Sequence, residues 1–202
     1  MARGRPLTGY KTAASERPGV SDPAPPELDV PESWRLVSEE TATPFDVRVV
    51  TISATTRIYE DTALRERLAA TTGTETTWRF VFASRLRIRP ARSPSAALTR
   101  LVADRASSAF VDVLEDRGFS SIDPADTHRF AVGGDDVDAT RYRARVRLDD
   151  RDLPVEAYFA AWPSDGAYLL GGGAYPLSLP AGESVDREGS RAELFGMMRS
   201  IR

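Results

Sequence analysis

Cysteine is absent from this 202-residue chain. Its absence excludes a disulfide, a thiolate nucleophile, a zinc finger and an iron–sulfur cluster held by cysteine. His128 is the only histidine, so a catalytic triad or a histidine metal site would depend on it. No apolar run approaches the roughly 20 residues that span a bilayer, and none follows the basic start of the chain as in a signal peptide. We therefore expect a soluble, cytoplasmic protein.

Lysine is also nearly absent, because Lys11 is the single lysine among 27 basic residues. The formal net charge of −3 argues against a surface that binds nucleic acid everywhere, although a local basic patch is compatible with it. Hydrophobic residues make up 41% and charged residues 28%, which is typical of a globular protein. The length suits one domain with a core. Prolines crowd the first 31 residues without periodicity, so we expect a flexible segment over 1–32 and a single domain over 33–202.

Arginine alternates with apolar residues in two stretches, 78–89 and 141–148. This period of two is typical of half-buried β-strands, which pack one face and expose the other. The apolar residues of the first stretch are Trp78, Phe80, Phe82, Leu86 and Ile88. The alternating arginines, which are our candidate ligand-binding residues, are Arg79, Arg85, Arg87, Arg89, Arg141, Arg143, Arg145 and Arg147.

These arginines have two interpretations. Arginine forks suit phosphate and carboxylate, so the sheet face could hold a small anionic ligand or single-stranded nucleic acid. The aromatic residues needed for base stacking occupy the opposite parity, which weakens the nucleic-acid hypothesis. Alternatively, the arginines pair across strands with acids such as Glu39, Glu40, Asp46 or Glu156, each pair contributing about 0.2 to 1 kcal/mol. We favour the paired arrangement, and the arginine parity is still the best place to look for function.

Helix and turn signals divide the rest of the chain. Asp61 or Thr62 should cap a short helix that ends near Gly73, and Ser93-Pro94 should begin a long helix that ends at Arg117. A last helix should begin near Asp186 and bury Leu194, Met197, Met198 and Ile201. Strands are expected over 34–40, 46–59, 77–89 and 129–132, with a break at Thr43-Pro44 and a loop over 123–128. The first two strands should form a hairpin.

Short turns separate the expected strands 139–148, 153–162 and 167–175, which indicates an antiparallel meander. The fold class is therefore α+β: an antiparallel sheet of about six to seven strands with a long central helix and a C-terminal helix packed on it. The order of elements, the Ser93-Pro94 helix and the segment Tyr168–Tyr175 resemble the PsbP-type α/β sandwich. The composition, rich in arginine and aspartate, is similar to that of small uncharacterised proteins of halophilic archaea. The resemblance implies a non-catalytic role as an assembly factor or binding partner.

No motif in the chain predicts catalysis, a metal or a cofactor. Gly171-Gly172-Gly173 matches neither phosphate-binding glycine pattern, and we expect these glycines to let a strand bend or a helix approach closely. We therefore expect a non-catalytic domain that binds a protein partner or a small anionic ligand, with no cofactor and no transmembrane segment. The alternatives are nucleic-acid binding through the arginine face and a hydrolase or isomerase built on carboxylates. A deep pocket with two converging acids would support the last of these.

Overall fold

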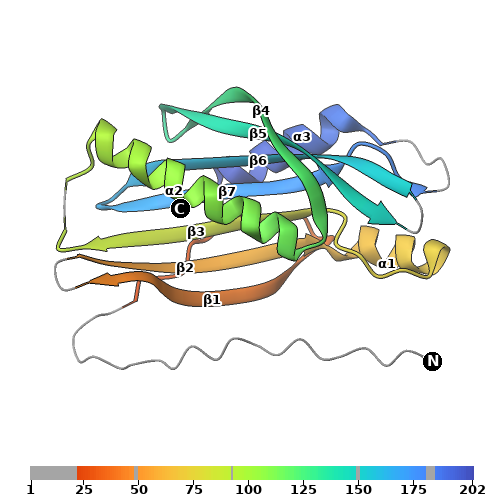
Figure 1. Ribbon diagram of the computed structural model, residues 1–202, viewed down its shortest axis with the longest axis horizontal. Helices are drawn as coiled ribbons and strands as arrows, with labels where there is room; N and C mark the ends of the chain where they lie inside the picture. The colour runs from red at the N-terminus through yellow and green to blue at the C-terminus, as the bar shows by residue number, and fades with distance from the viewer. Residues whose placement is uncertain (1–21, 48–49, 92, 149–150, 181–184) are drawn as a thin grey trace.

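Figure 1 shows a computed structural model of the chain, which describes residues 22–47, 50–91, 93–148, 151–180 and 185–202. The strands are β1 (Trp34–Val47), β2 (Val50–Asp61), β3 (Phe80–Arg89), β4 (Phe119–Val132), β5 (Asp135–Leu148), β6 (Arg151–Ser164) and β7 (Ala167–Pro176). The helices are α1 (Thr62–Thr72), α2 (Ala96–Asp116) and α3 (Arg187–Arg199). No helix in the described ranges is long and apolar enough to cross a membrane.

The strands form one seven-stranded sheet in the order β1-β2-β3-β7-β6-β5-β4, and every neighbouring pair is antiparallel. The predicted α+β class, the N-terminal hairpin and the C-terminal meander are confirmed. The contact between β3 and β7 joins the hairpin to the meander, and the chain between these two strands supplies α2 and the other meander strands. This long-range pairing makes one sheet, and therefore one core on each of its faces.

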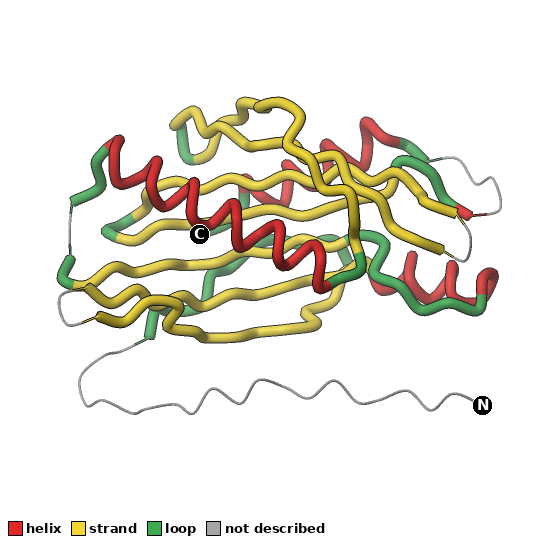
Figure 2. The backbone as a smooth tube through the Cα atoms, in the orientation of Figure 1, coloured by secondary structure: helices red, strands yellow, loops and turns green. Residues whose placement is uncertain are grey.

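Helices cover both faces of the sheet, α2 on one side and α3 on the other, as the two backbone views show (Figures 1 and 2). Phe80 and Phe82 pack under α2, as their parity predicts. Val81 and Ala83, on the opposite parity of the same strand, are also fully buried, because α3 and its cluster cover them. The expectation that β3 has one packed and one wet face is therefore wrong for its first half.

Capping side chains mark the start of α1 and of α2. The Asp61 side chain accepts a hydrogen bond from the backbone N–H of Leu64 at the start of α1, as predicted. The cap of α2 is Ser95 rather than Ser93, so that helix starts two residues later than expected. Gly118, with φ of +83°, follows the end of α2 in the left-handed conformation that glycine tolerates best.

Two segments that were predicted to interrupt strands lie inside strands instead. Thr43-Pro44 does not end the first strand, because β1 continues through it with a register shift between Ala42 and Phe45. The stretch 123–128, expected as a loop, lies inside β4, which takes up Pro124 through register shifts and bends along its length (Figure 2). Both strands lie at the edges of the sheet, where a proline costs no ladder hydrogen bond on the open side.

Two of the three glycines of β7, Gly171 and Gly173, let α3 and the residues after it lie close to the sheet. A Cβ atom at Gly171 would lie 2.5 Å from Cδ1 of Ile201, and one at Gly173 would lie 2.9 Å from Cδ1 of Leu194. The predicted close approach of a helix is thus confirmed. This approach places α3 along β7, with further contacts to β3 and β4.

An extended segment, residues 22–33, lies along the same side of the sheet as α3. Pro23 and Pro26 are buried, and the Pro23 carbonyl accepts a hydrogen bond of 2.7 Å from the Thr55 hydroxyl. Glu27 and Arg202 exchange two backbone hydrogen bonds, which tie the segment to the C-terminal residues. The predicted flexible segment 1–32 therefore includes residues that pack on the sheet, and its first part, 1–21, lies outside the described residues.

Candidate functional site

Both arginine rows lie on the α3 side of the sheet, which we call the α3 face. Arg85 pairs with Leu169 and Leu169 with Trp162, whereas Arg141 pairs with Tyr158. Paired residues share a face, and so do Tyr158 and Trp162, which are four residues apart on β6. The rows do not form one continuous surface, because α3 runs over β7 between them.

Arg141 is held by two carboxylates. Its Nε and Nη2 donate to Asp126 over 2.8 and 2.5 Å, and its Nη1 donates to Glu156 over 2.7 Å. The other carboxylate oxygen of Glu156 accepts from the buried Tyr175 hydroxyl at 2.7 Å. Burial, and then this hydrogen bond, raises the pKa of Tyr175. Arg141 therefore ties the edge strand β4 to the interior of the sheet and has little capacity left for a ligand.

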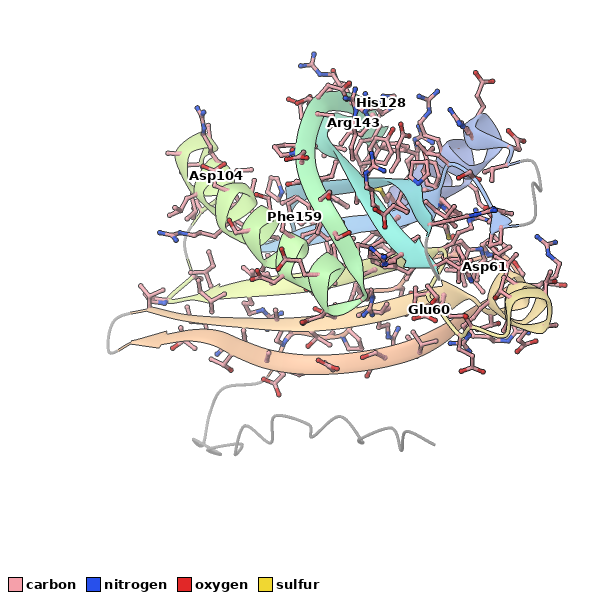
Figure 3. All side chains as sticks on the ribbon, turned by 45° about the vertical axis from the view of Figure 1, so that its right-hand side comes forward. Glu60, Asp61, Asp104, His128, Arg143 and Phe159 are labelled. Atoms are coloured by element: carbon pink, nitrogen blue, oxygen red, sulfur yellow. The ribbon has the colours of Figure 1, made fainter. Side chains whose placement is uncertain are left out.

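Arg79 is paired as well. Its guanidinium donates to Asp61 over 3.0 Å and to Glu193 of α3, and it lies over the Trp34 ring at 5.3 Å from the centroid. Asp61 lies at the junction of β2 and α1, where Figure 3 labels it beside Glu60. Arg79 therefore links the sheet to the start of α1 and to α3.

The arginines at the far end of β5 are exposed. Arg143 lies opposite Asp123 and Glu156 in the register. Arg147 lies 4.0 Å from Asp152. Arg145 is likewise exposed and contributes its backbone carbonyl to Ser120. Exposed charges of this kind are well solvated, so they contribute little to a specific site.

Arg85 and Arg87 differ from the other arginines. Both are half-buried, and neither forms an ion pair with any residue that the structure describes. The Nε of Arg85 is buried and has no hydrogen-bond partner in the described part of the chain, a property that it shares with the Nε atoms of Arg79 and Arg117. Arg89, at the end of the row, has an interaction of its own and is therefore left out of the candidate set.

Ser53 completes this group. It pairs directly with Arg87 across β2 and β3, it is 2% exposed, and its hydroxyl finds no partner among the described residues. Buried hydroxyls are nearly always hydrogen-bonded, so this group has unused donors. We call Arg85, Arg87 and Ser53 the arginine patch. Segment 22–33 borders the arginine patch, because the Pro23 carbonyl accepts a hydrogen bond from the Thr55 hydroxyl, and Thr55 pairs with Arg85 across the strands.

Sequence reasoning missed Ser53. The signal was available, because Thr51, Ser53 and Thr55 alternate with Ile52 and Ala54 and so place a polar parity next to that of the arginines. The strand pairing that sets these residues beside Arg85 and Arg87 was not readable without the register.

A cavity of about 300 Å³ lies between α1, α3 and the end of β7, and it bears on the enzyme alternative. Its lining includes two acids, Asp186 and Glu193. Asp186 caps α3 by accepting from the Gly189 N–H, and Glu193 pairs with Arg79. The acids of this cavity thus have structural partners. Within the described residues no three His, Asp or Glu side chains gather as a metal site.

Comparison with known proteins adds the family but no activity. No curated protein matches the chain. One similar solved structure is LpqN of Mycobacterium tuberculosis, described as involved in cell envelope biogenesis; it is 14% identical, the match covers 89% of this chain and 82% of that one, and the TM-score is 0.34. A likeness at that level carries no argument about this protein. Residues 22–202 match the family described as a domain of unknown function, DUF6517, and the chain therefore belongs to that family.

Proposed function

We propose that this protein is a non-catalytic binding domain and that its ligand, a small molecule or a group on a partner protein, presents an anion to the arginine patch. The observation that carries the proposal is the contrast between the arginines of one face. Arg79 and Arg141 are each held by two carboxylates, whereas Arg85 and Arg87 have none within the described structure. Half-buried guanidinium groups without a counter-charge are favourable places for an anion to bind.

Nucleic acid has less support as the ligand. Single-stranded nucleic acid is usually bound by a basic groove together with aromatic side chains on which the bases stack. The aromatic residues Tyr158, Trp162 and Tyr175 of the α3 face are at most 6% exposed, so they offer no stacking surface there. A cytoplasmic location, like the resemblance to the PsbP-type sandwich, stays a prediction.

Titration calorimetry with a panel of anions tests the proposal. The panel is citrate, sulfate, inorganic phosphate and a single-stranded oligonucleotide, each at the same ionic strength. We expect at least one of them to bind the wild type and to bind Arg85→Gln/Arg87→Gln about tenfold or more weakly, because charge-assisted hydrogen bonds are lost. Arg129→Gln is the matched control, since Arg129 is exposed on β4 and pairs with Asp138. Equal binding by the double variant, or no binding by the wild type, would refute the proposal.

A further inference from the structure

We propose that the group bound at the arginine patch is a phosphate dianion, either inorganic phosphate or a phosphate monoester. This inference rests on the proposed function and narrows it to one ligand chemistry. Arg85 and Arg87 bring two permanent positive charges to one face of β3, and no carboxylate of the described chain pairs with them. A monoester carries about two negative charges at neutral pH, whereas a phosphodiester or a single carboxylate carries one. The dianion therefore matches the charge of the patch.

The donor groups also fit a tetrahedral anion. The two arginines are two residues apart on one strand, so their Cα atoms are about 7 Å apart and their long side chains can converge on one ligand. Each guanidinium has five N–H donors, and Ser53 adds a hydroxyl beside Arg87. Phosphate offers three or four oxygens to accept these bonds, whereas a carboxylate offers two. The two unpartnered groups of the patch, the Arg85 Nε and the Ser53 hydroxyl, are both donors of the kind that phosphate oxygens accept.

The residues that face the two arginines across the neighbouring strands carry no ionisable side chain. The β2 neighbours of the arginines are Thr51, Ser53 and Thr55, and the β7 neighbour of Arg85 is Leu169, all uncharged. Among the nearest charged residues, Arg57 is paired with Glu39, Arg89 has an interaction of its own, and Glu27 pairs with Arg202. Asp22, at the start of the bordering segment, is exposed. A pH dependence that phosphate shows and sulfate does not therefore reports the ligand, because a phosphate monoester has a second pKa of about 6.

The test is calorimetry of the full chain with inorganic phosphate, glycerol phosphate, a phosphoserine peptide and dimethyl phosphate, at pH 7.5 and pH 5.0. Sulfate, which keeps two charges at both values, and citrate serve as reference anions. We expect inorganic phosphate or a monoester to bind at least about tenfold more tightly than dimethyl phosphate at pH 7.5. Its affinity should fall severalfold at pH 5.0, while that of sulfate stays constant. Binding of inorganic phosphate alone identifies the free ion as the source, and tighter binding of an ester identifies a phosphorylated partner or metabolite.

Substitutions in the arginine patch and at a control position show whether phosphate binds at the patch. Ser53→Ala should weaken phosphate binding severalfold, and Arg85→Gln/Arg87→Gln should abolish it, with Arg129→Gln unchanged. Thermal unfolding of each variant checks that it is folded. Equal affinity for dimethyl phosphate, or phosphate binding that does not change with pH, would overturn the dianion. Binding of citrate or the oligonucleotide at the patch without phosphate would overturn this inference alone, whereas no anion binding at all would overturn the proposed function too.

Discussion

Arg141 donates two hydrogen bonds to Asp126. Its Nε lies 2.8 Å from one carboxylate oxygen and its Nη2 lies 2.5 Å from the other. The two residues lie opposite each other, Arg141 on β5 and Asp126 on the edge strand β4. Asp126 follows Pro124 and a register shift, where the ladder between the strands is irregular. The bidentate pair therefore holds the edge strand at a place where its backbone pairing is irregular.

Acid should weaken this pair. The hydrogen bonds from Arg141 lower the pKa of Asp126 below its ordinary value of 3.8. A lowered pKa in the folded state means that the stabilisation is complete above the unfolded value and is lost as the pH falls through the folded one. The stability difference between wild type and Asp126→Asn should thus be constant above about pH 5 and shrink below 3.8. Urea unfolding from pH 3 to 7 measures it.

The control for this series is Asp104→Asn. Asp104 is an exposed residue of α2 (Figure 3), and its carboxylate forms no ion pair among the described residues. Its removal should leave the stability difference near zero across the range. A difference for Asp126→Asn that grows as the pH falls would contradict the prediction.

Phe80→Ala should destabilise the protein by about 3 to 5 kcal/mol, because it leaves a cavity in the core under α2. The Phe80 ring is fully buried, with the Phe119 ring at 6.0 Å between centroids and the Arg117 guanidinium at 5.1 Å. Denaturant unfolding measures the loss. Leu101→Ala, at a site that is 54% exposed, should cost less than about 1 kcal/mol. A loss below about 1 kcal/mol for Phe80→Ala would show that this face is not the tightly packed one.

Gly173→Ala should destabilise the fold by about 1 to 3 kcal/mol, because the new methyl group meets the Phe80 carbonyl and Leu194. Its contacts are with strand backbone and packed core, which have little room to move. Gly196→Ala is the matched control on α3, where nothing lies within 4 Å, so the higher helix propensity of alanine should stabilise by up to about 1 kcal/mol. Thermal unfolding gives both values. Equal effects of the two substitutions would refute the proposed close packing of α3 on β7.

The parts of the fold that sequence predicted well are those set by neighbours along the chain. The hairpin of β1 and β2, the caps at Asp61 and Asp186, and the turns of the meander each depend on a few adjacent residues. The loop expected over 123–128 was wrong for the opposite reason. Asp and Pro favour turns locally, but pairing with β5 holds them in an edge strand.

The candidate site shows the same division. Sequence alone identified the arginine parity of 78–89 and 141–148, because alternation along a strand follows from backbone geometry. It could not tell which arginines are paired. Arg141 meets Asp126 and Glu156, and Arg79 meets Glu193, only through strand register and the path of α3.

By itself, then, the sequence determined the class of fold, the order of its elements and the two rows of arginine, since these depend on local propensity and periodicity. The tertiary structure decided that both faces of the sheet are covered and that the rows are separated by α3. It also decided that Arg85 and Arg87, beside Ser53, have no carboxylate partner in the described chain. Whether a charge is paired depends on residues far apart in the sequence, and only the folded chain brings those residues within hydrogen-bonding distance.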